Sequence, residues 1–256
     1  MKKLIVYDQS CPMCRLYTKG MVATSKEGCT ARVGSNQLTD REVVSRIGPQ
    51  RARHEIPMVD LDGGETIYGI DTWAYAFGHK SHHLTYLLSL SWLRSILQRL
   101  YAFISYNRRI IITSAPGRWQ LLDLQPEFRL SYRIPFVLLL FGLVSVLFCV
   151  ILGSAWPIIG LITTQLLFVS LFLTFTKSAN ATETWLDYAG HLGMSLLIGG
   201  VVVLIGLLFG WSPLALVGHT LIIGQHFIRV YRLGLSPWLS VLFTGSLLLI
   251  INGSIL

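Results

Sequence analysis

The chain has 256 residues, of which 52% are hydrophobic and 13% charged, and its formal net charge is +8. This composition excludes a protein that is soluble along its whole length, because the apolar residues gather after residue 133 in stretches almost free of charge. The positive charge would suit nucleic acid, but no binding motif accompanies it, and basic residues beside membrane spans and anionic lipid explain it. We therefore expect a lipid bilayer as a partner and no nucleic acid.

The first elements place two cysteines at the start of a helix. A short strand is expected over Lys3–Tyr7 and a helix over Cys14–Lys26, with Cys11 and Cys14 at their junction. This C-x-x-C layout is typical of a thioredoxin-like redox site. The partial positive charge of a helix N-terminus favours a thiolate, the form that attacks disulfides, and Pro12 suits the first helical position.

Half of a zinc site is the alternative interpretation of this cysteine pair. Zinc sites of this kind usually carry a second pair, or two histidines at tight spacing. The remaining cysteines, Cys29 and Cys149, are single and far apart. The histidines that follow also lack the usual spacing: His54, His79, His82 and His83. We therefore expect redox chemistry and no metal.

The expected elements after the first helix follow the thioredoxin order in a compact form. They are a strand over Thr30–Val33, a helix over Asp40–Ile47, two short strands joined by an Asp62–Gly64 turn, and a helix from Gly69 to Phe77. The predicted fold class is an α/β thioredoxin-like domain over residues 1–83, followed by an all-α transmembrane helical bundle.

Pro57 stands at a position that contacts the substrate in thioredoxin-like folds. There, a cis proline before the third strand faces the C-x-x-C, and the backbone before it pairs with a substrate chain. Ile56-Pro57 has the right place for this role. We expect Pro12, Ile56 and Pro57 to contact the substrate, and we leave the cis and trans forms of Pro57 equally open.

Three motifs resemble the DCC family of thiol-disulfide oxidoreductase-like proteins. The run Asp8-x-x-Cys11-x-x-Cys14 matches the three letters that name the family. Gly69-Ile70-Asp71 is similar to its Gly-x-Asp, and residues 101–109 resemble its Tyr-rich stretch ending in Asn-Arg. The resemblance covers roughly the first 115 residues.

The resemblance implies roles for the three motif residues. Cys11, first and nearest to solvent, would attack, and Cys14 would resolve the mixed disulfide. Asp8 would accept a proton or tune the Cys14 thiol. The alternative for Asp8 is a strand-end residue that pairs with a loop N–H. The chain departs from the family at Gln9, where glycine is usual, and at residues 105–106, where Ala-Arg is common.

A linker segment over residues 84–133 joins the two halves. Within it, Tyr86–Ile112 has a broad apolar face at helical spacing, decorated by arginines. The pattern leaves two placements open, which are compatible. The helix can lie in the headgroup region of a membrane, or it can pack on the soluble domain.

Residues 134–256 carry about five apolar blocks near the roughly 20 residues that a bilayer span needs. The blocks are Ile134–Leu152, Pro157–Phe175, Tyr188–Phe209, Pro213–Val230 and Pro237–Ile251. The fourth block contains His219, Gln225 and His226, which leaves a re-entrant or interfacial placement open.

If all five blocks span the membrane, the basic residues near them all lie on the same side of it. Arg129 and Arg133 precede the first block, and Lys177 lies in the connection between the second and third blocks. Arg229 and Arg232 lie at the start of the connection between the fourth and fifth blocks. Because basic loops stay in the cytoplasm, we expect a bacterial inner-membrane protein with a cytoplasmic N-terminal domain and its C-terminus outside. The apolar stretch after the first three residues is too short for a signal peptide.

Three histidines lie within the apolar blocks. We expect His191, His219 and His226 to face the bundle interior, because ionisable groups in a span avoid lipid. They are candidate cofactor-binding residues with three open interpretations: ligands of haem or another metal, a quinone or proton path, or hydrogen bonds that bridge helices. Small residues nearby would let helices approach closely: Gly190, Gly193, Gly218 and Gly224.

The sequence thus predicts a membrane-anchored thiol-disulfide oxidoreductase. Its cytosolic C-x-x-C site would exchange electrons with a protein or small-molecule thiol or disulfide, alone or coupled to the membrane domain. This chemistry requires no cofactor. The alternative is a non-enzymatic membrane module for assembly, transport or redox sensing, whose thioredoxin-like domain binds partners.

Overall fold

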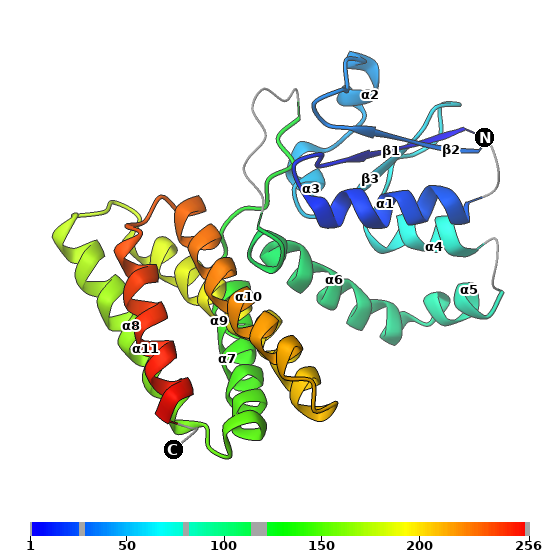
Figure 1. Cartoon of the computed structure of the whole chain (residues 1–256). Coiled ribbons are helices and arrows are strands. Elements are labelled where there is room, and N and C mark those ends of the chain that lie inside the picture. The colour runs from blue at the N-terminus through cyan, green and yellow to red at the C-terminus, as the bar shows by residue number, and fades with distance from the viewer. Residues whose placement is uncertain (1, 26–28, 79–81, 114–121, 254–256) are drawn as a thin grey trace. The chain divides into compact units, whose positions relative to one another are not determined.

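The chain forms two compact units, Met1–Arg129 (unit 1) and Leu130–Leu256 (unit 2), in a computed structural model (Figure 1). The structure describes residues 2–25, 29–78, 82–113 and 122–253. Each unit is described by itself below.

Unit 1 is built on a four-stranded mixed sheet with the strand order β2-β1-β3-β4. The central strand β1 (Lys3–Tyr7) runs parallel to β2 (Thr30–Gly34) and antiparallel to β3 (Pro57–Asp60). The short strand β4 (Ile67–Tyr68) pairs antiparallel with β3. The expected strands and the turn between β3 and β4 are confirmed.

Helices cover both faces of this sheet, because alternate strand residues point to opposite sides. On one face, Ile5 and Met58 pack with α1 (Pro12–Thr24) and α4 (Ile70–Gly78). On the other face, Val6 and Val59 pack with residues of three further segments. These are α2 (Arg41–Ser45), α3 (Pro49–Ala52) and the chain around Leu122–Leu124.

Two local features go beyond what the sequence decided. The short helix α3 was not predicted, although Pro49 suits its first position after Gly48. The Ile56–Pro57 bond is trans, which decides between the two forms that the sequence left open. The trans form fits the pairing of Pro57 with Tyr68 at the start of β3, and it is the form that X-Pro bonds ordinarily take.

The predicted amphipathic segment forms two helices, α5 (His82–Ser89) and α6 (Ser91–Ile111), separated at Leu90. The last turns of α6 are buried in unit 1, including Tyr106 and Ile110. Its first turns leave large apolar side chains exposed. Packing on unit 1 is therefore confirmed for the C-terminal end of α6.

Unit 1 extends beyond α6 through the residues that precede unit 2. Leu122 and Leu124 are 4% and 2% exposed and join the sheet core. Arg129 lies over the ring of Tyr106, with its guanidinium carbon 5.2 Å from the ring centroid. Of the segment expected to form a linker, the described residues up to Arg129 thus belong to the first unit.

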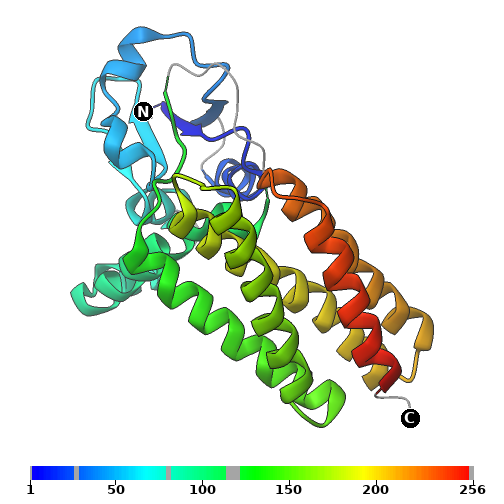
Figure 2. The same cartoon turned by 90° about the vertical axis from the view of Figure 1, so that its left-hand side faces the viewer.

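Unit 2 is helical (Figure 2). Three of its helices are long and apolar enough to cross a membrane: α7 (Leu130–Leu152), α8 (Trp156–Phe175) and α9 (Ala181–Leu208). The fourth block forms α10 (Ser212–Arg232), which does not meet that criterion. The fifth forms α11 (Trp238–Gly253), which is apolar but shorter. Each predicted block is a helix, and a membrane-associated chain with three candidate spans is supported.

Close glycine contacts pack α9 against α10. A Cβ atom on Gly199 would lie 2.6 Å from the carbonyl oxygen of Gly218, and one on Gly218 would meet the backbone of Val203 at 2.6 Å. Gly193 likewise approaches Leu140 of α7. The expected close approach of a neighbouring helix is not found at Gly224, where a Cβ would meet no described atom within 4 Å.

Candidate active site

The two cysteines occupy the first turn of α1. Cys11 is the N-cap residue, and its Sγ accepts a hydrogen bond from the backbone N–H of Cys14 at 3.4 Å. The exposed Pro12 takes the next position, where its missing N–H costs nothing. A sulfur at an N-cap faces the free N–H groups and the positive end of the helix dipole, so this position stabilises a thiolate.

Both thiols are buried. Cys11 is 0% exposed and Cys14 1%, and both are free cysteines. The structure therefore does not open Cys11 to solvent, as its expected role as the attacking thiol would suggest. The physical reason is the apolar core beneath α1, which includes both cysteines together with Ile5 and Met58.

The two thiols differ in acidity. A hydrogen bond from the Cys14 side chain lowers the pKa of Cys11 to about 6, assisted by the Cys14 backbone and Arg108 and opposed by burial. The same hydrogen bond, together with burial, raises the pKa of Cys14 well above its ordinary value. The pair therefore holds one thiolate, on Cys11, and one proton, on Cys14, near neutral pH.

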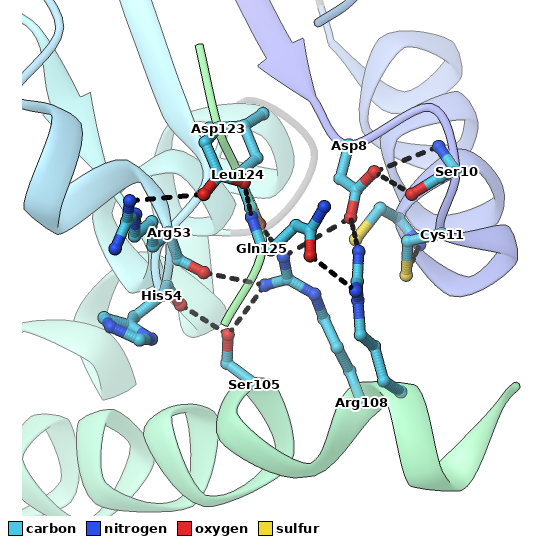
Figure 3. A network of polar contacts seen from close by, with 12 residues as sticks. Asp8, Ser10, Cys11, Arg53, His54, Ser105, Arg108, Asp123, Leu124 and Gln125 are labelled. Atoms are coloured by element: carbon cyan, nitrogen blue, oxygen red, sulfur yellow. Dashed lines mark hydrogen bonds and ion pairs between the residues drawn. The ribbon is translucent and has the colours of Figure 1, made fainter. Parts of the chain in front are cut away.

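A buried arginine supplies positive charge to this pair. Arg108, from α6, is 5% exposed. Its guanidinium donates to the carbonyl oxygen of Arg53 at 3.1 Å, to the Ser105 hydroxyl at 3.2 Å, and to the carbonyl oxygen of Leu124 (Figure 3). These contacts hold the charge in the interior, where it lowers the pKa of Cys11 by less than the hydrogen bonds from Cys14 do.

Asp8 lies between the cysteine loop and two arginines. Its Oδ1 accepts hydrogen bonds from the backbone N–H and hydroxyl of Ser10, at 3.0 and 2.5 Å. Its Oδ2 lies 3.6 Å from Arg108 and 3.8 Å from Arg109 (Figure 3). Asp8 thus holds the loop in place, as its structural alternative predicts, and its charge raises the pKa of Cys11 against the larger lowering effects. The proposed action of Asp8 on Cys14 stays a prediction.

An aromatic cavity adjoins the cysteines. The Tyr17 hydroxyl donates to the Sγ of Cys14 at 3.7 Å. Tyr17 also lines a cavity of about 290 Å³. Its other lining residues are Met13, Trp73, Tyr101, Ile104, Ser105 and Arg108. Burial raises the pKa of Tyr101 to about 12, so its hydroxyl stays protonated at any ordinary pH.

The expected substrate-pairing segment is already hydrogen bonded. The backbone N–H of Ile56 donates to the Tyr101 hydroxyl at 3.1 Å, and its carbonyl accepts from the Thr72 hydroxyl at 3.1 Å. Pro57 is buried at the start of β3. A substrate backbone would have to displace Tyr101 in order to pair with Ile56.

The membrane histidines separate into two buried residues and one half-buried residue. His226 is 1% exposed and His191 8%, and His191 Nδ1 lies 2.9 Å from an Arg229 guanidinium nitrogen. His219 is half-buried. The predicted interior location is confirmed for His191 and His226, whereas the structure does not bring His219 into their hydrogen-bond network.

Metal ligands do not gather in the part of the chain that the structure describes. No group of three His, Cys, Asp or Glu residues there could hold an ion. His54 stacks on Tyr106 instead, with ring centroids 4.0 Å apart. His79 and the side chains of His82 and His83 lie outside the described residues.

Sequence reasoning missed most of the residues that surround the thiols. Arg108 belongs to the Asn-Arg pair of the DCC resemblance, so a signal for it was present, but its position beside Cys11 depends on how α6 packs. Tyr17, Trp73 and Tyr101 carried only the helical periodicity of core residues. In comparisons with known proteins, no family model, curated protein or solved structure matches the chain.

Proposed function

We propose that unit 1 is a thioredoxin-like domain that catalyses thiol–disulfide exchange, and that the chain belongs to the DCC family. The strand order and the helices on both sheet faces support the fold. The observation that carries the function is Cys11 at the N-cap of α1, with Cys14 one turn on and Arg108 beside them.

The geometry suits a two-step reaction. The Cys11 thiolate attacks one sulfur of a substrate disulfide, which forms a mixed disulfide and releases the other sulfur as a thiolate. Cys14 then attacks the Cys11 sulfur, and the substrate leaves as its second thiol. Consumption of the Cys11 thiolate removes the main cause that raises the pKa of Cys14, so the resolving thiol becomes more acidic when it is needed.

Redox sensing is the second candidate function. It is favoured by the burial of both sulfurs, at 0% and 1% exposure, because a large protein substrate cannot reach them without local opening. A sensor needs one oxidation event, whereas an enzyme turns over. Repeated reduction of a disulfide substrate in the presence of excess dithiothreitol supports the enzyme, and a single stoichiometric event supports the sensor.

The decisive experiment measures reversible disulfide formation in the full chain. After oxidation with a small disulfide, alkylation and mass analysis should show Cys11 linked to Cys14, and reduction should restore both thiols. Cys29 and Cys149 act as internal controls that remain alkylated throughout. The proposal fails if the folded protein never crosslinks this pair, or if both thiols are held by zinc.

We further propose that unit 1 is cytoplasmic and that the C-terminus lies outside. The basic residues before α7 and at the end of α10 support this orientation. A reporter fused after Leu256 should be active outside the cytosol, and one fused before Met1 inside. A cytosolic C-terminal reporter would require an even number of spans and would refute the orientation.

A further inference from the structure

The cavity beside the thiols has the properties of a site for a flat, mostly apolar molecule. One of its walls is the pair Tyr17 and Trp73, whose rings stack on each other with centroids 5.6 Å apart. The cavity reaches the surface at Ile104, which is 40% exposed. Its volume of about 290 Å³ admits one substituted six-membered ring and little more.

Two of the lining residues carry hydrogen-bond donors that the described protein does not use. The Nε of Arg108 and the Nε1 of Trp73 are buried and have no hydrogen-bond partner among the described residues. A buried donor without a partner costs free energy, so a molecule that accepts hydrogen bonds at two places would be stabilised here. This pattern fits a ring with two acceptor oxygens.

An exposed apolar stripe leads to the mouth of the cavity along α6. Trp92, Ile96, Leu100 and Ile104 recur every four residues and are 62%, 54%, 51% and 40% exposed. Residues at this spacing share one helix face. A hydrocarbon tail that leaves the cavity at Ile104 would continue along this stripe instead of entering water.

The chain continues from unit 1 directly into the first candidate span. Residues 122–129 pack on unit 1, and the first candidate span, α7, begins at Leu130. In sequence, unit 1 thus ends one residue before the helix that would enter the bilayer. An amphipathic helix at such a place binds the headgroup region through its apolar side chains.

We infer that the cavity binds the ring of a membrane quinone and that the quinone oxidises the cysteine pair. The ring lies in the cavity beside the stacked Tyr17 and Trp73 side chains, its carbonyl oxygens accept hydrogen bonds from Arg108 and Trp73, and its tail lies along the α6 stripe. This inference rests on the proposed function and names its electron acceptor.

The reaction balances without another oxidant or reductant. The Cys11 thiolate adds to a ring carbon, and the Cys14 sulfur then attacks Cys11, which forms the S–S bond and breaks the S–C bond. The electron pair passes to the ring. The Cys14 proton completes one quinol hydroxyl, and a proton from water completes the other, because Cys11 reacts as a thiolate. Tyr17 separates the cavity from Cys14 and must rotate for the ring to reach the sulfurs.

The test uses the reduced full-length protein in lipid nanodiscs, with a fully substituted benzoquinone that carries a decyl chain, which cannot arylate thiols permanently. We expect one quinol, followed by its ultraviolet absorbance, for each Cys11–Cys14 disulfide, followed by alkylation and mass analysis. Ile104→Trp should fill the cavity mouth and slow this reaction about tenfold or more. Leu61→Trp, at an exposed position outside both the lining and the stripe, should leave the rate within about twofold of the wild type.

Two further measurements separate this inference from the proposed function. Trp73→Phe keeps the aromatic wall but removes one donor, and should raise the half-saturating quinone concentration about fivefold. The same proteins are oxidised with a water-soluble disulfide. If that disulfide crosslinks Cys11 and Cys14 but the quinone does not, the quinone site is refuted and the exchange activity stands. If neither oxidant forms the crosslink, the proposed function fails as well. An unchanged quinone rate in Ile104→Trp refutes the cavity as the site.

Discussion

Unit 1 and unit 2 each bury a network of polar side chains, and the two networks are put to different use. Around the thiols of unit 1, polar groups converge on a reactive pair and adjoin a cavity with unused donors. In unit 2, polar groups from different helices mainly bond one another. The comparison separates a network that holds charge ready for chemistry from one that holds helices together.

The unit 2 network runs through four helices. The Tyr188 hydroxyl of α9 donates to Gln165 of α8 at 3.0 Å and lies 3.2 Å from His226 Nε2 of α10. The other ring nitrogen, Nδ1, lies 2.9 Å from the hydroxyl of Ser240 in α11. His226 also stacks on Phe243, with centroids 4.1 Å apart.

The direction of these hydrogen bonds defines which ring nitrogen of His226 carries the proton. Since Tyr188 gives its proton to Gln165, the Nε2 of His226 donates to the Tyr188 oxygen, and Nδ1 accepts from Ser240. A neutral imidazole is then satisfied at both nitrogens. We infer that His226 bridges helices, because a haem or metal ligand would need one nitrogen free.

The largest expected effect is the loss of Arg108. Arg108→Met removes the buried guanidinium that donates hydrogen bonds to Arg53, Ser105 and Leu124. It also removes one of the positive charges that lie beside the buried Asp8 carboxylate. Unit 1 should lose about 3–5 kcal/mol of unfolding free energy, and the pKa of Cys11 should rise. Denaturant unfolding and thiol alkylation measure the two effects. Arg51→Met, at an exposed position, is the matched control and should change both little.

The second largest expected effect is the pH dependence of the alkylation rate of Cys11. With a pKa of about 6, its alkylation rate should level off above pH 7 and be about tenfold slower at pH 5, because only the thiolate reacts. Rates are followed by mass analysis with iodoacetamide, and Cys149 serves as a comparison within the same chain. Cys14→Ala removes the first cause of the shift and should move the midpoint to higher pH. A midpoint near 9 in the wild type would contradict the thiolate.

Local sequence signals predicted much of the fold. Pro12 after Cys11 marks the start of α1, and the glycines at 153 and 210 end helices with positive φ angles of 72° and 62°. Charge-free blocks predicted the helices of unit 2. These features depend on neighbours in the chain, which a sequence displays directly.

The site could be predicted only in part, because its remaining groups come from distant segments. Nothing local to Arg108 indicates that it lies beside Cys11, and the burial of Cys11 depends on the core that α1 and the sheet build together. His219 and His226 share a helical spacing, but neighbouring helices bury one more than the other. Packing between elements decides such cases, and periodicity does not encode it.

A smaller effect is expected for the helix-bridging histidine. His226→Phe keeps an aromatic ring on Phe243 but loses the hydrogen bonds to Tyr188 and Ser240. Unit 2 should lose about 1 kcal/mol of stability, the usual scale for hydrogen bonds between membrane helices, and the thiols should react as before. Thermal unfolding in detergent measures the loss, with His219→Phe as the half-buried control. Loss of redox activity at full stability would instead favour a cofactor or proton path.

The smallest effect is expected at an ion pair that joins α4 to α6 on the surface of unit 1. Arg94 lies 2.5 Å from Asp71, in the Gly-x-Asp motif, but the two side chains are 44% and 35% exposed. Asp71→Asn should therefore cost only about 0.5 kcal/mol, against several for Arg108, because water and salt screen exposed charges. Urea unfolding at low salt and at about 1 M salt measures the difference, which should vanish at high salt. A double-mutant cycle with Arg94→Gln isolates the pair. A coupling as large as that of the buried arginine would show that exposure does not separate the two pairs, and would place Asp71 within the machinery that positions α6 and its cavity.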